Sequence, residues 1–262
     1  MSPESEAPEV FVVHAIHFAS REGLRGQHFL GHDDRSGEPH PTAYYVWLAV
    51  SDRRVVLVDA GLDPEHHSAL PGLEFHGSPV DGLAALGVDP GDVTDVVLTH
   101  LHHDHTGTVA RFPRARYVVQ RAEADYWTGP VAARIHREHW LCTDADVRHV
   151  LGSDRLALVD GDRELAPGLS VHRVGGHTAG MQVVRVHTAA GWVVLASDAA
   201  HFAENLADDR PAPILHAMPD VYAAFDRVRE LADAPELVVP GHDPEVTRRF
   251  PAVPGTRAHR IA

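Results

Sequence analysis

Four separate apolar runs in this chain each end at a side chain that can bind a metal ion. The runs are "DVVLTH", "LSVHRVGGH", "WVVLASD" and "ELVVPGH", and they end at His100, His177, Asp198 and His242. Short apolar runs bounded by turn residues are typical of buried strands. Strand ends are rigid places from which side chains can converge on one point. The sequence therefore predicts a metal site at one edge of a β-sheet.

The first run leads into "THLHHDHTG", the densest histidine cluster of the chain. The chain holds 22 histidines in 262 residues, so a local cluster alone proves little. The spacing is more informative. His100 and His102 project to the same side of an extended chain and can hold one ion. Asp104 and His105 follow a turn and can hold a second ion, whereas His103 falls on the intervening position and is predicted to bind neither.

The other strand ends complete two sets of ligands. His177 joins His100 and His102 on the first ion, His242 joins Asp104 and His105 on the second, and Asp198 bridges the two ions. Imidazole and carboxylate together suit Zn²⁺, and also iron, manganese or cobalt. The one cysteine excludes a cysteine-rich zinc site. The sequence predicts two divalent ions, with Zn²⁺ as the favoured metal.

Charge and composition limit the possible partners. The formal net charge of -14 would repel a phosphate backbone, which argues against nucleic acid. The chain has no lysine, which excludes Schiff-base chemistry. No apolar run reaches the roughly 20 residues of a membrane helix, and the N-terminus lacks the basic start of a signal peptide. We expect a cytoplasmic protein that binds a small-molecule substrate and no membrane.

The order of elements predicts an α+β fold. Most segments resemble strands, among them 43–50, 53–61 and 181–188, and the clearest helix lies over 219–234. This order favours two packed sheets flanked by helices over a regular βαβ alternation. We expect one domain over residues 1–262, with residues 1–8 disordered. Residues 14–40 are rich in histidine and could fold over the site as a lid loop.

Four motifs, "THLHHDHTG", "GGHTAG", "SDAAHF" and "VPGHDP", resemble those of the metallo-β-lactamase superfamily. The resemblance covers roughly residues 40 to 250. It implies an αββα sandwich, two mixed β-sheets flanked by helices, with the metals at one edge. "VVLVDAGLD" resembles the early strand of the family, and this implies that Asp59 lies beneath the metals and orients a ligand.

Within the superfamily, the chain is most similar to the N-acyl-homoserine lactonase branch, whose members act in quorum quenching and are commonly dimers, so a homodimer is implied here. A tyrosine commonly lies three residues after the bridging aspartate in that branch, and here the position is His201. Histidine could donate a proton or a hydrogen bond there, or it could mark a different substrate. The resemblance gives Asp104 and His201 as the catalytic candidates.

The implied activity is hydrolysis of a small carbonyl ester, an N-acyl-homoserine lactone or a related lactone, by a water shared between two ions. Six aromatic residues could line an apolar pocket for the acyl chain: Trp127, Trp140, Tyr126, Phe29, Tyr44 and Tyr45. An alternative is a thioesterase resembling the hydroxyacylglutathione hydrolases, which share the ligand pattern but usually carry a C-terminal helical domain. A non-catalytic metal-binding scaffold is disfavoured because all seven ligand positions are intact.

Overall fold

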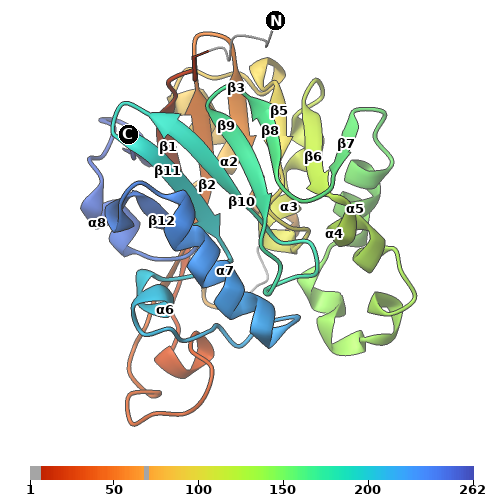
Figure 1. Ribbon diagram of the computed structural model, residues 1–262, viewed down its shortest axis with the longest axis vertical. Helices are drawn as coiled ribbons and strands as arrows, with labels where there is room; N and C mark the ends of the chain where they lie inside the picture. The colour runs from red at the N-terminus through yellow and green to blue at the C-terminus, as the bar shows by residue number, and fades with distance from the viewer. Residues whose placement is uncertain (1–6, 68–70) are drawn as a thin grey trace, which may run out of the picture.

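The structure is a computed structural model that describes residues 7–67 and 71–262. Its strands form two sheets that pack face to face, as Figure 1 shows. Most of the segment expected to be disordered, residues 1–8, lies outside the described residues. Among the described residues, no helix is long and apolar enough to span a membrane.

The first sheet is mixed and runs in the order β13-β1-β2-β3-β5-β6-β7, with β4 paired to β1. Its strands β1, β2 and β3 are antiparallel, whereas β3, β5, β6 and β7 are parallel to one another. The bounds are β1 Val12–Arg21, β2 Thr42–Val50, β3 Val55–Val58, β4 Leu73–Phe75, β5 Asp95–Val97, β6 Arg116–Gln120, β7 Leu156–Val159 and β13 Ala258–Arg260.

The second sheet runs in the order β12-β11-β10-β9-β8 and is antiparallel except for the parallel pair of β11 and β12. Its strands are β8 Arg163–Ala166, β9 Leu169–Arg173, β10 Gln182–Thr188, β11 Gly191–Ser197 and β12 Val238–Pro240. Val171, Val184 and Leu195 of this sheet share one fully buried core with Trp47 and Val58 of the first sheet. Burial of this apolar surface holds the two sheets together.

Helices cover the outer face of each sheet, so the predicted αββα sandwich is confirmed. Helix α7 places Val221, Phe225 and Val228 on the face that packs against the second sheet, at the spacing of a helical stripe. The helices are α1 Pro64–His67, α2 Pro79–Ala85, α3 His103–Thr106, α4 Arg121–Trp127, α5 Asp144–Leu151, α6 Ala203–Ala207, α7 Met218–Leu231 and α8 Glu245–Arg249. Short 3-10 turns are η1 Arg25–Gln27, η2 Pro90–Asp92, η3 Val109–Arg111, η4 Ala132–Arg134, η5 His136–Leu141 and η6 Pro235–Leu237.

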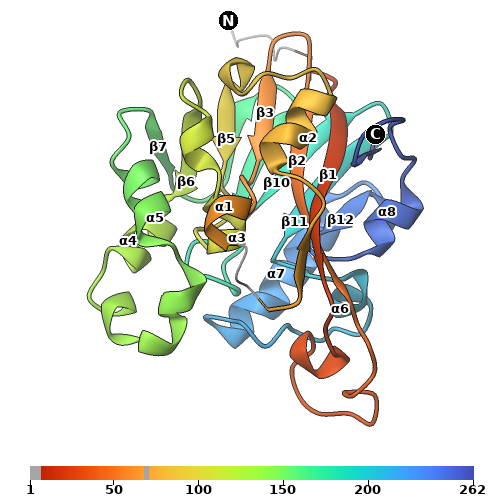
Figure 2. The same ribbon diagram turned by 180° about the vertical axis from the view of Figure 1, so that it is seen from behind.

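The predicted lid over residues 14–40 needs a correction. Residues 14–21 belong to β1, where they pair with β2 and, from Ala19, also with β4, so only residues 22–41 form a loop, which contains η1. Figures 1 and 2 show this loop below the sandwich, next to α6. Arg210 holds it there by donating hydrogen bonds to the carbonyls of Leu30 and Gly31.

Candidate metal centre

The ends of strands from both sheets bring the predicted ligands together. His100 and His102 follow β5 of the first sheet, and Asp104 and His105 lie in α3, which begins immediately afterwards. The second sheet contributes the remaining three, which follow β9, β11 and β12: His177, Asp198 and His242. All seven side chains occur in groups whose ligand atoms lie within 4.8 Å of one another.

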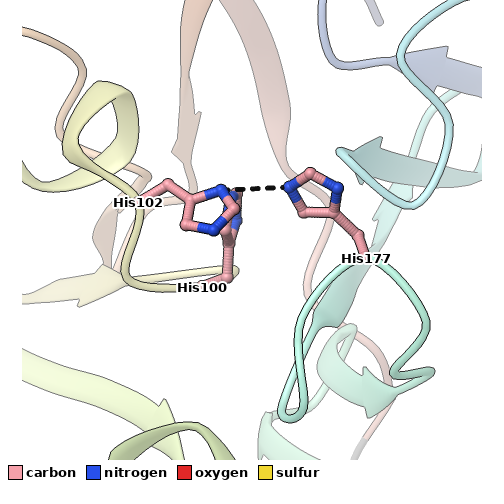
Figure 3. Close-up of side chains that lie close together, drawn as sticks. All are labelled: His100, His102 and His177. Carbon is pink, nitrogen blue, oxygen red and sulfur yellow. Dashed lines mark hydrogen bonds between the residues drawn. The ribbon is translucent and has the colours of Figure 1, made fainter. Parts of the chain in front are cut away.

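The first group consists of three imidazoles. His100, His102 and His177 lie together, and the Nδ1 atom of His102 is 3.1 Å from the Nε2 atom of His177. Figure 3 shows His102 and His177 approaching from opposite sides with ring nitrogens turned toward each other. The sequence separation of 75 residues between them is closed by the packing of one sheet on the other.

Asp198 faces two sets of imidazoles with its two oxygens. Its Oδ1 atom lies 3.3 Å from Nε2 of His105 and 3.1 Å from Nε2 of His242. Its Oδ2 atom lies 3.4 Å from Nε2 of His177 and 2.9 Å from Nε2 of His201. Asp104 completes the side of His105 and His242, at 3.6 Å and 3.7 Å from their Nε2 atoms. A carboxylate shared in this way suits two adjacent cations.

Hydrogen bonds on the outer side of three rings fix which nitrogen faces inward. Nδ1 of His105 lies 2.8 Å from Oδ2 of Asp59. Nδ1 of His177 lies 2.9 Å from the carbonyl of Ile214, and Nδ1 of His242 lies 3.0 Å from that of Ala43. Because a carbonyl or carboxylate can only accept, each Nδ1 carries the proton and each Nε2 keeps a lone pair for a metal.

Asp59 lies beneath the ligands, where the resemblance places it. Its carboxylate accepts hydrogen bonds from the backbone N–H of Thr99 at 2.8 Å and from the hydroxyl of Ser197 at 3.1 Å. Its own backbone adopts a left-handed φ of 60°, which is uncommon for a residue other than glycine. One buried carboxylate therefore connects the end of β5, the end of β11 and the His105 imidazole.

The protonation states suit metal binding. Burial lowers the pKa of His100 and His102 well below the ordinary value and that of His177 to about 4, so these rings stay neutral at neutral pH. Burial opposes ionisation of Asp198 and Asp104, but nearby imidazoles outweigh it and hold the pKa of both carboxyls low. For His105 and His242 burial opposes protonation, but the adjacent carboxylates outweigh it and raise the pKa of both rings. Neutral imidazoles and ionised carboxylates bind metal ions, so binding there would release protons.

Several inward-facing atoms of the predicted ligands have no hydrogen-bond partner in the described part of the chain, which also fits a metal site. Among the described residues, Nε2 of His100, Nε2 of His105 and Oδ1 of Asp198 are buried without a hydrogen bond of good geometry. Buried polar atoms are normally satisfied, and a group of unsatisfied ones that face a common point needs an explanation. Divalent cations satisfy all of them at once, so the residues fit the metals that the sequence implied.

Two glycines permit the close approach of the ligand loops. Gly176 has φ +84°, and a Cβ atom there would lie 2.7 Å from the backbone nitrogen of Val221 in α7. A Cβ atom on Gly241 would lie 2.9 Å from Oδ1 of Asp198. The residue that follows each glycine is a predicted ligand, as the sequence indicated.

A cavity of about 220 Å³ opens onto these ligands. An adjoining groove of about 190 Å³ shares His102, His177 and Trp140 with it. Of the aromatic residues predicted for an acyl pocket, Tyr126, Trp127 and Trp140 line this groove and Tyr44 lines the cavity. Phe29 and Tyr45 line neither and are buried. The remaining groove residues include Pro213, Ile214, Leu215 and His216, from a loop that the sequence analysis did not single out.

Side chains from β1, β2 and the loop 22–41 also line the cavity. The side chain of Arg21 hydrogen-bonds the phenol of Tyr44, and both line the cavity. The Tyr44 ring meets that of His242 edge-on at 5.0 Å. From the loop 22–41, Gln27 and His28 reach the cavity wall. Neither Arg21 nor Gln27 belongs to a motif, so no sequence pattern marks them.

Glu123 is a buried carboxylate that the sequence analysis also missed. It accepts hydrogen bonds from the backbone N–H of Leu101 at 3.1 Å, from that of Gly180 at 2.8 Å and from the indole of Trp127 at 2.8 Å. Leu101 lies between His100 and His102, and Gly180 lies in the loop of His177. Glu123 therefore ties together the two backbone segments that carry the first ligand group.

The two histidines of uncertain role lie in different places. His103 is turned toward the carbonyl of Leu141, 3.2 Å from its Nδ1 atom, and joins none of the ligand groups formed by the described residues. His201 lies at the cavity wall and forms a group with His177 and Asp198.

The sequence matches a known protein family. The family model of the metallo-beta-lactamase superfamily matches residues 39–242. The chain belongs to this superfamily. In this member of the metallo-β-lactamase superfamily, the histidine and aspartate groups at the sheet edge form a binding site for divalent metal ions.

Among curated members of the superfamily, the chain is similar to N-acyl homoserine lactonases. It is 33% identical to the lactonase AttM of Azorhizobium caulinodans over 184 residues, 66% of each chain. It is 28% identical to the N-acyl homoserine lactonase of Bacillus thuringiensis over 221 residues, 77% of this chain and 81% of that one.

Solved structures show the same fold. A quorum-quenching N-acyl homoserine lactone lactonase gives a TM-score of 0.76 at 21% identity, over 96% of this chain and 99% of that one. AidC, a dizinc quorum-quenching lactonase, gives a TM-score of 0.70 at 17% identity, over 92% and 90% of the two chains.

Proposed function

We propose that this chain is a metal-dependent hydrolase that opens N-acyl homoserine lactones or closely related lactones. The observation that carries the proposal is the two-sided Asp198, which faces His105 and His242 with one oxygen and His177 with the other, at the base of a cavity. We further propose that the centre holds two ions, most simply Zn²⁺, because the donors are five imidazoles and two carboxylates.

The ligand assignment follows the two faces of Asp198. We assign His100, His102 and His177 to one ion and Asp104, His105 and His242 to the other, with Asp198 between them. When bound, a pair of divalent ions supplies a water of lowered pKa as nucleophile and a Lewis acid for the carbonyl. The curated relatives, which are named as N-acyl homoserine lactonases, support this assignment of substrate.

The cavity and groove fit a substrate with one polar end and one apolar end. A lactone ring in the cavity would lie beside the ligands, and the acyl chain would extend along the groove between Trp127, Trp140 and Ile214. The side chain of Trp140 is 60% exposed, so contact with an acyl chain would bury apolar surface and favour binding.

Two side chains of the cavity can transfer a proton or donate a hydrogen bond to the substrate. Asp104 stays ionised because the imidazoles around it, His105 foremost, outweigh burial and keep its pKa below the ordinary value. We assign it to proton relay toward the leaving oxygen. Burial raises the pKa of the Tyr44 phenol, so this group stays protonated and can donate a hydrogen bond to a substrate oxygen.

The test is a hydrolysis panel with protein of defined metal content. Purified protein loaded with Zn²⁺, iron, manganese or cobalt would be offered short- and long-chain homoserine lactones, acyl-glutathione thioesters and a β-lactam. We expect turnover of lactones to exceed that of the other classes and to vanish after chelation. Preferential turnover of acyl-glutathione would reassign the protein as a thioesterase, and intact lactones with every metal would refute the proposal.

A further inference from the structure

His201 occupies the position where the sequence departs from the lactonase branch, and its placement does not match that of a simple proton donor. Its Nε2 atom is buried and 2.9 Å from Oδ2 of Asp198, yet among the described residues it forms no hydrogen bond of good geometry. The short distance without alignment means that the in-plane direction of the ring nitrogen passes beside the carboxylate oxygen.

This geometry is the one that two ligands of a common ion adopt. Two atoms bound to one ion at about 2.1 Å each are roughly 3.0 to 3.4 Å apart for angles between 90° and 109°. In that case both lone pairs point at the ion, so neither atom points at the other. The pair His177–Asp198 at 3.4 Å falls in this range, and His201–Asp198 at 2.9 Å lies just below it.

Like two of the assigned ligands, His201 has a buried ring nitrogen without a hydrogen-bond partner among the described residues. Nε2 of His100, Nε2 of His105 and Nε2 of His201 are all buried, and none forms a hydrogen bond of good geometry with a described residue. The His201 ring also meets those of His177 and His242 edge-on, at 5.2 Å each. The ring thus lies among the ligands at the base of the cavity.

The backbone around His201 is fixed, which a ligand requires. The carbonyl of His201 accepts a hydrogen bond from the backbone N–H of His242 at 2.8 Å, and Gly241 donates to the carbonyl of Ala200 at 3.0 Å. The segment between Asp198 and His201 is therefore hydrogen-bonded to the segment that carries His242. The side chain of His201 is only 12% exposed.

We propose that His201 is an eighth metal ligand, which shares an ion with His177 and Oδ2 of Asp198. This inference rests on the proposed metal-dependent function but concerns this chain's own donor set. That ion would be held by the imidazoles of His177 and His201 and by the carboxylate of Asp198, whose donor atoms lie within 4.8 Å of one another. The side of His105 and His242 keeps Asp104, so the two ions would differ in their donors and in preferred metal.

The experiment measures metal binding, not turnover. Apo-protein would be titrated with Zn²⁺ against a chromophoric chelator, for the native chain, His201→Phe and His201→Gln. Loss of a group that only orients a ligand typically costs 10–100-fold in affinity, so loss of a direct ligand should raise one of the two dissociation constants at least about tenfold. X-ray absorption at the zinc edge should show six imidazoles shared by two ions in the native chain and five in either variant.

His28→Asn is the matched control. This imidazole faces the same cavity, but its Nε2 atom lies 3.0 Å from the carbonyl of His40 and 3.2 Å from the hydroxyl of Thr42, so it is already used. We expect its removal to leave both dissociation constants unchanged. A folded His201→Phe protein with native zinc affinity and native imidazole count would overturn the proposal and return His201 to a proton-donor role.

The outcome is independent of the lactone assignment. If His201→Phe weakens metal binding and lowers the imidazole count while the native chain hydrolyses no lactone, His201 stands as a ligand and the substrate proposal fails. If the native chain hydrolyses lactones and His201→Phe keeps its metal affinity, the substrate proposal stands and His201 is no ligand.

Discussion

Two regions of this molecule gather histidines around a cavity, and the two cavities are similar in size. The metal centre faces one of about 220 Å³. On the outer side of the first sheet, His17 and His76 line another of about 230 Å³, which we term the outer histidine pocket. There, the Nε2 atoms of both rings lie 2.9 Å and 2.8 Å from the hydroxyl of Ser20.

The two regions differ in whether their imidazole nitrogens are already used. In the outer histidine pocket, the Ser20 hydroxyl satisfies both Nε2 atoms. In the metal centre, carbonyls and Asp59 satisfy the outer nitrogens of His105, His177 and His242. The Nε2 atoms of His100, His105 and His201 are buried there without a hydrogen bond to a described residue. In a histidine-rich chain, the informative property is therefore a set of unsatisfied nitrogens directed at one point, and not the number of histidines in a region.

The sharpest way to test this contrast is to change the carboxylate between the two ligand groups. Asp198→Asn keeps the shape of the side chain but replaces one oxygen by a donor that faces imidazoles. Because Asp198 contacts both groups, we expect a loss of more than about 100-fold in metal affinity and in lactone turnover. Elemental analysis and initial rates measure the two effects.

Asp162→Asn is the control for that change, because Asp162 contacts His172 and Arg227 far from any predicted ligand. It should keep native metal content. An Asp198→Asn protein with full occupancy and activity would show that Asp198 does not bridge the two ligand groups.

A smaller effect is expected from Glu123, which orients the ligand segments without touching an ion. In Glu123→Gln, the amide NH₂ would face an N–H group that now donates a hydrogen bond to the carboxylate, so that hydrogen bond would be lost. We expect a 10–100-fold loss of metal affinity, mainly for the ion assigned to His100, His102 and His177. Chelator competition measures it.

Trp127→Phe separates the contributions to that effect. It removes the indole hydrogen bond to Glu123 but leaves those from Leu101 and Gly180. Metal affinity should stay near the native value. If Glu123→Gln and Trp127→Phe changed affinity equally, Glu123 would not act through the ligand backbone.

The smallest effect should come from the outer histidine pocket and should concern stability alone. Burial and then the nearby His76 lower the pKa of His17 to about 4, so the unfolded chain binds a proton at His17 that the folded chain does not. Stability from this group is therefore complete above pH 6.5 and is lost as pH falls toward 4, by up to about 2 kcal/mol at pH 5.

His17→Gln should reduce this loss of stability. Urea unfolding of the metal-loaded native chain and variant at pH 7 and pH 5 measures it, with equal metal content expected in both proteins. An unchanged pH dependence of the unfolding midpoint would show that His17 does not carry this linkage.

The sequence predicted those parts of the fold and site that depend on contiguous residues. The ends of β5, β11 and β12 were found because each strand lies in a short apolar run, and the end of β9 because apolar and polar residues alternate in "LSVHR". Strands β4, β8 and β13 were missed because "LEF", "RELA" and "AHR" carry too few apolar residues to differ from loops. Their pairing with a long neighbouring strand stabilises them, and one sequence does not show that pairing.

The parts of the site that were missed depend on contacts between distant segments. Glu123 resembles any glutamate of an amphipathic helix in "RAEADYW", and only the fold brings Leu101 and Gly180 to it. The proposed ligand role of His201 also depends on such a contact. Asp198 and His201 are neighbours in sequence, but only the packing of the strand ends brings the His177 imidazole to them.

The ligands of the centre come from both layers of the sandwich, which has a consequence for folding. Bound ions act as cross-links between the two sheets, so a chain that unfolds must first release them. At a free metal concentration 100 times the dissociation constant, each such ion adds about 2.7 kcal/mol to the free energy of unfolding. Metal supply would then set how long the folded protein persists as well as whether it works, and starvation for metal would remove the enzyme by unfolding and proteolysis.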